Sequence, residues 1–252
     1  MTVRGARPPI RRVVVTVPTW NESLNIELLV KELLALGPHV EVLVADDDSP
    51  DGTWKLVAAM AEREPRVHLM HRKTDRGRGR AGRDAFVKAL AMGADAAVEM
   101  DADFSHPPRY IPQMLAQLEE GYDVVLGSRG VSGGKDLGRP LSRRVITRLA
   151  NLYIRMMLGV PVKDCNSGFR AWRRSALEAV RVGQTASQGP AIVQELLFKA
   201  VQAGQCVTEV PIEFVERARG ESSLTLGKLM QGYIMVLRLR WWALTGKLWR
   251  QT

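Results

Sequence analysis

Cysteine is nearly absent from this chain of 252 residues. Cys165 and Cys206 lie far apart, and neither belongs to a CxxC pair or to a Cys/His cluster. The sequence therefore argues against a disulfide framework and a structural zinc site, and it fits a reducing compartment. A chain of this length buries a core large enough to fold without covalent cross-links.

Long hydrophobic runs are missing too. No apolar stretch reaches the roughly 18 residues that indicate a transmembrane helix. The nearest approach, residues 229–249, carries Arg238 and Arg240 in its middle, where charge is costly in a bilayer. We therefore predict no membrane span. Residues 1–12 lack an apolar segment and are not expected to form a signal peptide.

Several catalytic motifs are also absent. No GxGxxG follows the first predicted strand and no Walker sequence occurs, which argues against a dinucleotide oxidoreductase and a P-loop NTPase. No Ser/His/Asp triad is evident. The four histidines, at positions 39, 68, 71 and 106, have no ligand spacing and are expected on the surface or in turns.

Positive charge is what the sequence has in excess. Its 36 Lys and Arg against 27 Asp and Glu give a formal charge of +9, which suits nucleic acid, an anionic membrane or a phosphorylated substrate. The Arg-rich run at residues 76–82 could turn its backbone N–H groups to a diphosphate, or form a solvated basic loop. Nucleic-acid binding predicts interleaved aromatics, but aromatics are only 6% and the run has none beside it before Phe86.

Hydrophobic patterning predicts an α/β fold. Strands are expected at residues 12–18, 40–45, 67–71, 96–100 and 123–126, with helices between them at residues 21–36, 53–63, 81–92 and 110–119. This alternation favours a mostly parallel sheet flanked by helices. After a Gly-rich loop at 127–140, we expect helices at 141–158, 191–203 and 228–247, a turn and a strand at 164–172, and a strand at 206–214.

Polar residues cluster where three of these strands end. The first strand runs into Pro18-Thr-Trp-Asn-Glu22, the second into Asp46-Asp-Asp-Ser-Pro-Asp-Gly52, and the fourth into Asp101-Ala-Asp103. Ligands of open α/β sheets bind at this edge, and two carboxylates at i and i+2 can share one Mg²⁺ or Mn²⁺ with substrate phosphates. Acidic residues after strands also form turns and helix caps. Three clusters at three matching ends favour a site.

These motifs, in this order, resemble a known family. The segments 18–22 and 46–53 are followed by Asp101-Ala-Asp103 with His106-Pro-Pro108, then by Gly127-Ser-Arg129 and by Asp164-Cys-Asn-Ser-Gly-Phe-Arg170. Together they resemble the family 2 glycosyltransferases of the GT-A fold, most closely the polyprenol (dolichol) phosphate mannose synthases. The resemblance runs from about residue 12 to about residue 227. It implies a GT-A domain at 12–227, after a basic tail at 1–11 and before an amphipathic helix at 228–252.

The resemblance implies a reaction and a set of site residues. The reaction is transfer of mannose from GDP-mannose to a polyprenyl phosphate with inversion, dependent on Mg²⁺ or Mn²⁺. The implied nucleoside pocket is lined by Pro18, Trp20, Glu22, Asp46 and Asp48, and the implied metal ligands are Asp101 and Asp103. The implied contacts to the lipid phosphate are Arg129 and Arg143, and Arg217 opens a loop that closes over the site.

The chain departs from the family pattern at four places. Trp20 replaces a common Tyr, and Ser105, a weaker ligand, stands where a third metal ligand is often Gln. A GLG motif reads Arg78-Gly79-Arg80, and a Lys after GxS is Ser223. The last two changes fall where the family contacts the donor phosphates.

A lipid acceptor requires a membrane, and two stretches suit its surface. Helix 141–158 places three arginines on one face and apolar residues on another. The C-terminal helix has an apolar face lined by Met230, Tyr233, Leu237, Trp241, Leu244 and Leu248. We expect this helix to lie in the interface, which makes the protein peripheral on the cytoplasmic face of the membrane. Packing against the protein body or a dimer partner is the alternative.

Three other interpretations remain open from the sequence. A UDP-sugar donor would keep the fold and change the sugar. A nucleic-acid-binding protein would explain the charge, although the few aromatics lead us to expect no nucleic-acid partner. A non-catalytic scaffold is disfavoured by the intact pair Asp101 and Asp103.

Overall fold

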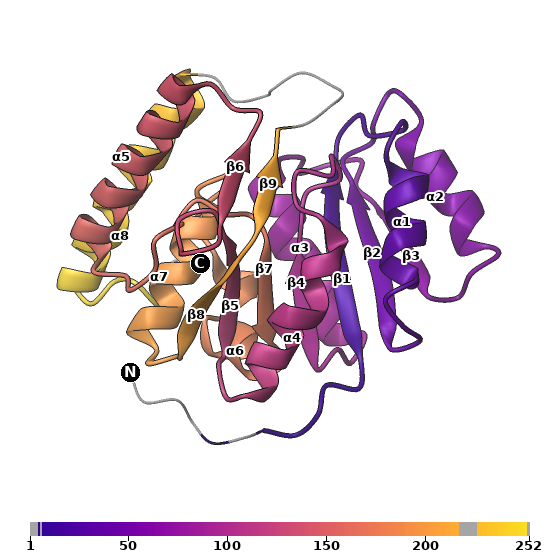
Figure 1. The fold of residues 1–252 in the computed structure, drawn as a ribbon, viewed down its shortest axis with the longest axis horizontal. Helices are drawn as coiled ribbons and strands as arrows, with labels where there is room; N and C mark the ends of the chain where they lie inside the picture. The colour runs from indigo at the N-terminus through magenta and orange to yellow at the C-terminus, as the bar shows by residue number, and fades with distance from the viewer. Residues whose placement is uncertain (1–4, 6, 217–225, 251–252) are drawn as a thin grey trace.

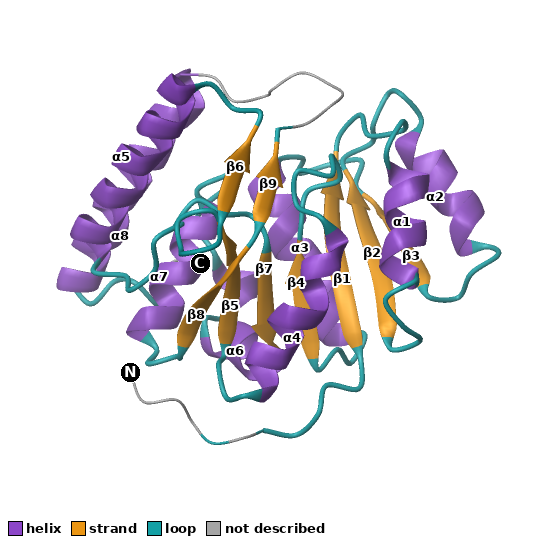
Figure 2. Cartoon of the chain, viewed as in Figure 1, coloured by secondary structure: helices purple, strands orange, loops and turns teal. Residues whose placement is uncertain are grey.

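A central sheet forms the middle layer of the molecule. In the computed structural model, which describes residues 5, 7–216 and 226–250, seven strands pair in the order β3-β2-β1-β4-β7-β5-β8 (Figure 2). They are β1 (Val13–Thr19), β2 (Val40–Asp46), β3 (Val67–His71), β4 (Ala96–Glu99), β5 (Val124–Ser128), β7 (Arg170–Arg173) and β8 (Val207–Pro211). All run parallel except β7, which is antiparallel to both neighbours. The mostly parallel sheet predicted from the sequence is confirmed.

Helices cover both faces of this sheet (Figure 1). One face carries α1 (Ile26–Leu34), α2 (Thr53–Ala61) and α4 (Ile111–Glu119), which follows the 3-10 turn η1 (Pro108–Tyr110). The other face carries α3 (Arg78–Ala91), α6 (Arg174–Ala179), η2 (Val182–Gln184) and α7 (Ile192–Gln202). Two long helices, α5 (Leu141–Leu158) and α8 (Leu226–Leu244), pack against each other, and α8 also packs on α7.

Two short strands lie apart from the main sheet. β6 (Lys135–Leu137) pairs in parallel with β9 (Glu213–Val215), and both lie above the carboxyl ends of the main strands in Figure 1. The segment 127–140, expected to be a loop, therefore contains a strand, and the expected strand 206–214 is broken into β8 and β9. Both differences arise because β6 finds its partner more than 70 residues away along the chain.

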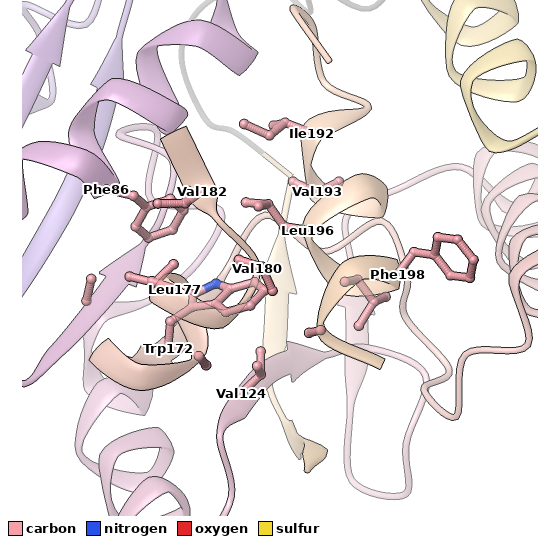
Figure 3. Close-up of a cluster of buried hydrophobic side chains, with 14 of the residues drawn as sticks. Phe86, Val124, Trp172, Leu177, Val180, Val182, Ile192, Val193, Leu196 and Phe198 are labelled. Atoms are coloured by element: carbon pink, nitrogen blue, oxygen red, sulfur yellow. The ribbon is translucent and has the colours of Figure 1, made fainter. Parts of the chain in front are cut away.

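Successive residues of a strand belong to two separate hydrophobic cores, one on each face of the sheet. Val14 and Leu43 belong to the core under α3, α6 and α7, whereas Val13 and Val15 belong to the core under α1 and α4. Strand β1 is buried at every position, as expected for a β-branched central strand with helices on both faces. Figure 3 shows the first core around Trp172.

Replacing Trp172 by alanine is expected to lower the free energy of unfolding by about 3–5 kcal/mol. The side chain is fully buried and meets Phe86 edge-on, with ring centroids 6.3 Å apart. Within the described residues, its indole Nε1 has no hydrogen-bond partner. Trp172→Phe therefore removes volume but no hydrogen bond, and it should cost clearly less. Urea unfolding of the three proteins measures both losses, and equal losses for the two variants would contradict this account.

Candidate active site

The three predicted polar loops meet at the carboxyl edge of the sheet. Strand β1 lies between β2 and β4, so the loops after these three strands are neighbours. This is the switch point where open α/β sheets bind ligands. Each loop holds one non-glycine residue with a left-handed backbone: Asn21 (φ 60°), Asp48 (φ 63°) and Phe104 (φ 60°). Such conformations are costly and gather at functional sites.

A cavity of about 720 Å³ opens beside this edge. Its polar lining includes Asp101, Asp103 and Ser105 from the loop after β4, and Arg129 from the end of β5. Helix α5 adds Arg143 on the same cavity. Five predicted site residues from three separate segments of the chain are therefore brought together. The described structure does not include Arg217, the other predicted catalytic residue.

The predicted nucleoside-binding residues lie outside that cavity, in the adjoining loops after β1 and β2. Pro18 is buried within β1. Asp46 is also buried, and its carboxylate accepts hydrogen bonds from Thr19 Oγ1 (2.7 Å), Ser49 N (2.8 Å) and Ser49 Oγ (2.7 Å). Asp46 therefore stabilises the conformation of the loop after β2. A direct contact of Pro18 or Asp46 with the nucleoside stays a prediction.

Trp20, Glu22 and Asp48 lie nearer the surface of the same loops. The Trp20 ring is half exposed, and Glu22 accepts a hydrogen bond from Asn25 Nδ2 at 2.9 Å. Asp48 Oδ1 is 2.7 Å from His71 Nε2, and its other oxygen pairs with Arg76. The hydrogen bond from His71 and the charge of Arg76 lower the pKa of Asp48.

Two histidines belong to the site, although the sequence placed them on the surface or in turns. His71 stacks on the Trp54 ring with centroids 4.3 Å apart while it holds Asp48. His106 is buried beside Phe169 and lies 3.9 Å from Asp101 Oδ2. Burial lowers the pKa of His106, which favours a neutral ring. Sequence spacing missed both because Asp48, which contacts His71, and Phe169, which packs against His106, lie far from them in the sequence.

The predicted metal ligands offer two carboxylates and one hydroxyl to a divalent cation. Asp101 and Asp103 present carboxylates to the cavity, and Asp103 Oδ1 accepts a hydrogen bond from Ser105 N at 3.1 Å. The Ser105 hydroxyl is buried, 3.4 Å from His106 Nδ1. In the described ranges, no group of three or more His, Cys, Asp or Glu side chains is placed to hold a metal. Two carboxylates fit a cation that takes further oxygens from a substrate's phosphates, as Mg²⁺ does.

Arg129 is held rigidly at the cavity by Asp164. Its Nε and Nη2 donate to the two carboxylate oxygens of Asp164 at 2.7 and 2.8 Å, and the guanidinium lies 4.7 Å from the Phe214 ring centroid. Burial by itself raises the pKa of Asp164, but the hydrogen bonds and charge of Arg129 outweigh it and lower this pKa below its usual value. A bidentate pair of this kind fixes the position of the cation.

Two more arginines complete the basic side of the cavity. Arg143 pairs with Glu216 at 2.8 Å. Arg139, which sequence reasoning missed, donates to Asp136 (3.0 Å) and to Thr147 Oγ1 (3.2 Å) and lines the same cavity. Its place follows from the β6–β9 pairing, which no local pattern signals.

Comparison with known proteins identifies the family. The sequence profile described as Glycosyl transferase family 2 matches residues 14–181, more than half of the chain. The chain belongs to glycosyltransferase family 2. This confirms the enzyme class that the ordered motifs predicted.

Relatives of this glycosyltransferase match over most of its length. The polyprenol monophosphomannose synthase of Mycolicibacterium smegmatis is 38% identical over 241 residues, 95% of this chain and 90% of that protein. The undecaprenyl-phosphate mannosyltransferase of Micrococcus luteus is 38% identical, over 94% of this chain and 99% of that protein. The dolichol-phosphate mannosyltransferase of Pyrococcus furiosus is 36% identical, over 92% of this chain and 64% of that protein.

Solved structures agree on the fold. The glucosyl-3-phosphoglycerate synthase of Mycobacterium tuberculosis, crystallised with Mn²⁺, UDP and glucosyl-3-phosphoglycerate, is 22% identical and superimposes with a TM-score of 0.66. The match covers 91% of this chain and 80% of that one. The GT-A fold expected for the glycosyltransferase is thereby confirmed.

The Arg-rich run of the glycosyltransferase is neutralised by carboxylates of neighbouring loops. The ion pairs of this region join Arg72 to Asp47 and Asp84, Arg76 to Asp48, Arg78 to Glu99 and Asp101, Arg80 to Asp75, and Arg83 to Asp75 and Asp84. The N–H of Gly77 donates to Asp47 Oδ2 at 2.7 Å. The run is therefore not a freely solvated basic loop, and one of its N–H groups is already engaged.

Helices α5 and α8 lie side by side (Figure 1). Both carry exposed apolar side chains. We call these side chains the α5–α8 face; they belong to Leu141, Val145, Ile146, Leu149, Leu152, Met156, Met230, Ile234, Leu237, Trp241 and Leu244. The opposite side of α8 buries Val236 and Leu239 in the core. Helix α8 therefore packs on the protein body and also leaves an apolar face uncovered.

Two residues expected on that face lie elsewhere. Tyr233 lines the cavity, and its ring meets that of Tyr153 with centroids 5.2 Å apart. Leu248 is buried in the core, contrary to the sequence prediction. The reason is that α8 ends at Leu244 and Gly246 takes a positive φ of 68°, which moves the following residues out of the helical register. Within the described residues, no helix combines the length and the apolar character that crossing a bilayer requires.

Proposed function

We propose that this glycosyltransferase transfers mannose from GDP-mannose to a polyprenyl phosphate, with inversion at the anomeric carbon. One observation carries the proposal: a single cavity is lined by both charged and apolar side chains. The charged ones include Asp101, Asp103 and Arg129, and the apolar ones are Ile146, Ala150, Ile154 and Val236 from α5 and α8. A phosphate on a long hydrocarbon chain matches that distribution. The names of the relatives, which act on polyprenyl phosphates, support the same acceptor.

The acceptor phosphate is held by arginines that the protein has already positioned. Arg129 cannot swing away, because Asp164 binds it through two hydrogen bonds. Arg139 and Arg143 reach the same cavity from the β6–α5 segment. Guanidinium forks suit phosphate oxygens. These cations reduce the repulsion between the acceptor phosphate and the diphosphate of the donor.

Chemistry at this site requires no general base. A phosphate oxygen is already ionised at neutral pH, so the nucleophile needs no proton removed. Ser105 lines the cavity, and buried His106 lies behind it, 3.9 Å from Asp101 Oδ2. Asp101 and Asp103 would hold Mg²⁺ or Mn²⁺, which when bound neutralises charge on the leaving diphosphate. Positioning and electrostatic stabilisation then supply most of the acceleration.

The α5–α8 face is the surface through which we propose that the enzyme meets the membrane. The same two helices, α5 and α8, also line the cavity, and Ile146 belongs to both surfaces. Arg144, Arg148 and Arg155 on α5, and Arg238 and Arg240 on α8, have no carboxylate partner among the described residues. Apolar side chains flanked by cations that have no carboxylate partner in the described part of the chain fit an anionic interface. We propose that the protein works peripherally, on the cytoplasmic face of the membrane.

Replacing one residue of each helix tests this surface. Leu149→Asn with Trp241→Asn is expected to weaken binding to vesicles containing anionic phospholipid at least tenfold, because each side chain contributes roughly 1.5–3 kcal/mol when fully buried. Leu28→Asn with Val87→Asn changes exposed apolar residues of α1 and α3 and should leave vesicle binding unchanged. If the two double variants lose vesicle binding equally in a flotation assay, the α5–α8 face is not the membrane contact.

Transfer of labelled mannose tests the function itself. The assay combines GDP-mannose, a polyprenyl phosphate in detergent, and Mg²⁺ or Mn²⁺ or chelator. Metal-dependent formation of a lipid-linked mannose supports the donor, the acceptor and the cation together. Activity with UDP-glucose and none with GDP-mannose would overturn the sugar and keep the site. Failure with every nucleotide sugar would overturn the catalytic proposal.

A further inference from the structure

A guanidinium already donates a hydrogen bond to one of the two carboxylates that are predicted as metal ligands. Arg78, in the first turn of α3, donates from Nη2 to Asp101 Oδ1 at 3.1 Å and from Nη1 to Glu99 Oε1 at 2.8 Å. Glu99 is the last residue of β4 and is buried. One arginine therefore bridges the interior of the sheet and the edge of the active site.

Packing fixes this arginine in place. A Cβ on Gly82 would lie 2.6 Å from Glu99 Oε1, so only glycine leaves room for the carboxylate beside α3. A Cβ on Gly79 would lie 2.4 Å from the carbonyl oxygen of Gly189, which shows how closely the 188–189 segment covers the first turn. A buried carboxylate needs a cation beside it, and Glu99 therefore retains Arg78 at the site whatever binds there.

The neighbouring cation does not replace it. Arg170 is buried close by, but its guanidinium donates to the backbone oxygens of Cys165, Ser167 and Val193. Its hydrogen bonds thus hold the 165–167 turn to α7, and Arg78 is the guanidinium that bonds Glu99.

We propose that Arg78 is a built-in counter-charge of Asp101 that makes divalent-cation binding depend on a nucleoside diphosphate. In the empty enzyme a metal ion must compete with Arg78 for Asp101. The described residues supply no third acidic, His or Cys ligand that would favour the metal ion over Arg78. A diphosphate brings oxygens for the metal and negative charge for Arg78, so both cations are satisfied together. This inference rests on the proposed function, because it takes the donor to be a nucleoside diphosphate sugar.

Direct binding of Mn²⁺, followed by loss of the free-ion paramagnetic resonance signal, tests the proposal without any turnover. For the wild type we expect weak binding of Mn²⁺ alone and at least tenfold tighter binding with GDP. Arg78→Gln should bind Mn²⁺ alone about tenfold tighter, and GDP should then add little. Arg80→Gln removes the same charge from the same turn but from a residue paired with Asp75, and it serves as the matched control.

A second variant distinguishes a change in Mn²⁺ affinity from a failure to fold. Arg78→Gln leaves buried Glu99 without its cation, whereas Arg78→Gln with Glu99→Gln removes both charges and is expected to fold. If neither variant binds Mn²⁺ alone more tightly than Arg80→Gln, the counter-charge proposal is overturned. If wild-type enzyme with Mn²⁺ binds UDP and not GDP, the proposed donor fails instead. The Arg78 comparison is then decided with UDP, by the same criterion.

Discussion

Asp103→Asn is expected to lower the rate of sugar transfer roughly 1,000-fold while the protein stays folded. Asparagine has the same shape and keeps an oxygen that can accept the N–H of Ser105, now at 3.1 Å. It removes the negative charge that a divalent cation requires at this position. With two predicted carboxylate ligands at the cavity, losing one leaves Asp101 alone, and Asp101 also binds Arg78.

Steady-state transfer measured across a Mn²⁺ titration, with circular dichroism as the check on folding, decides this prediction. Glu120→Gln, a carboxylate-to-amide change at the exposed end of α4, is the matched control and should keep full activity. Retention of more than a tenth of wild-type activity by Asp103→Asn at every Mn²⁺ concentration would show that Asp103 is not a metal ligand.

Arg129→Met is expected to abolish transfer and also to lower the free energy of unfolding by about 3–5 kcal/mol. The destabilisation arises because Asp164, almost completely buried, loses the cation that binds both of its carboxylate oxygens. The loss of activity arises because the acceptor phosphate loses the arginine that the fold positions best. Urea unfolding and the transfer assay measure the two effects separately.

The double variant Arg129→Met with Asp164→Asn separates structure from catalysis. Because no buried charge is left unpaired, most of the lost stability should return, whereas transfer should remain absent. Arg139→Met is the control at the same cavity and should reduce activity less, because Arg139 does not hold Asp164. Recovery of transfer by the double variant would show that Arg129 acts only through stability.

The loss of stability in acid should reveal the ion pair between Arg129 and Asp164. Arg129 holds the pKa of Asp164 below its usual value in the folded protein, and the unfolded chain has an Asp pKa of about 3.9. The stability from this difference is therefore complete above about pH 5 and is lost as pH falls through the folded pKa. Unfolding measured between about pH 3 and pH 7 should show a shallower acid loss for the double variant than for the wild type.

Local sequence patterns predicted the elements that depend on neighbouring residues. The β-branched run at β1 predicted a buried strand because both faces of a central strand meet helices. The period of α5 predicted its bounds, 141–158, as the structure has them. The polar loops after β1, β2 and β4 were predicted to converge because carboxyl ends of parallel strands share one edge.

Other features were decided by tertiary contacts between distant segments. The antiparallel insertion of β7 between β4 and β5 and the pairing of β6 with β9 join residues far apart, so no local period encodes them. The sequence left the Arg-rich run as either a diphosphate-binding segment or a solvated basic loop, and the fold brought carboxylates from other loops to it. The buried position of His106 likewise depends on Phe169 and Phe214, which lie far from it in the sequence.

One physical reason separates the features that the sequence predicted from those that only the tertiary structure decided. Hydrophobic period and motif order depend on residues a few positions apart. They determined the α/β class and the family, and they predicted Asp101 and Asp103 as metal ligands. Charge pairing and burial depend on which surfaces meet when the chain closes. Only the tertiary structure therefore placed Arg78 on Asp101, Asp164 on Arg129, and the cavity between the carboxylates and the apolar helices α5 and α8.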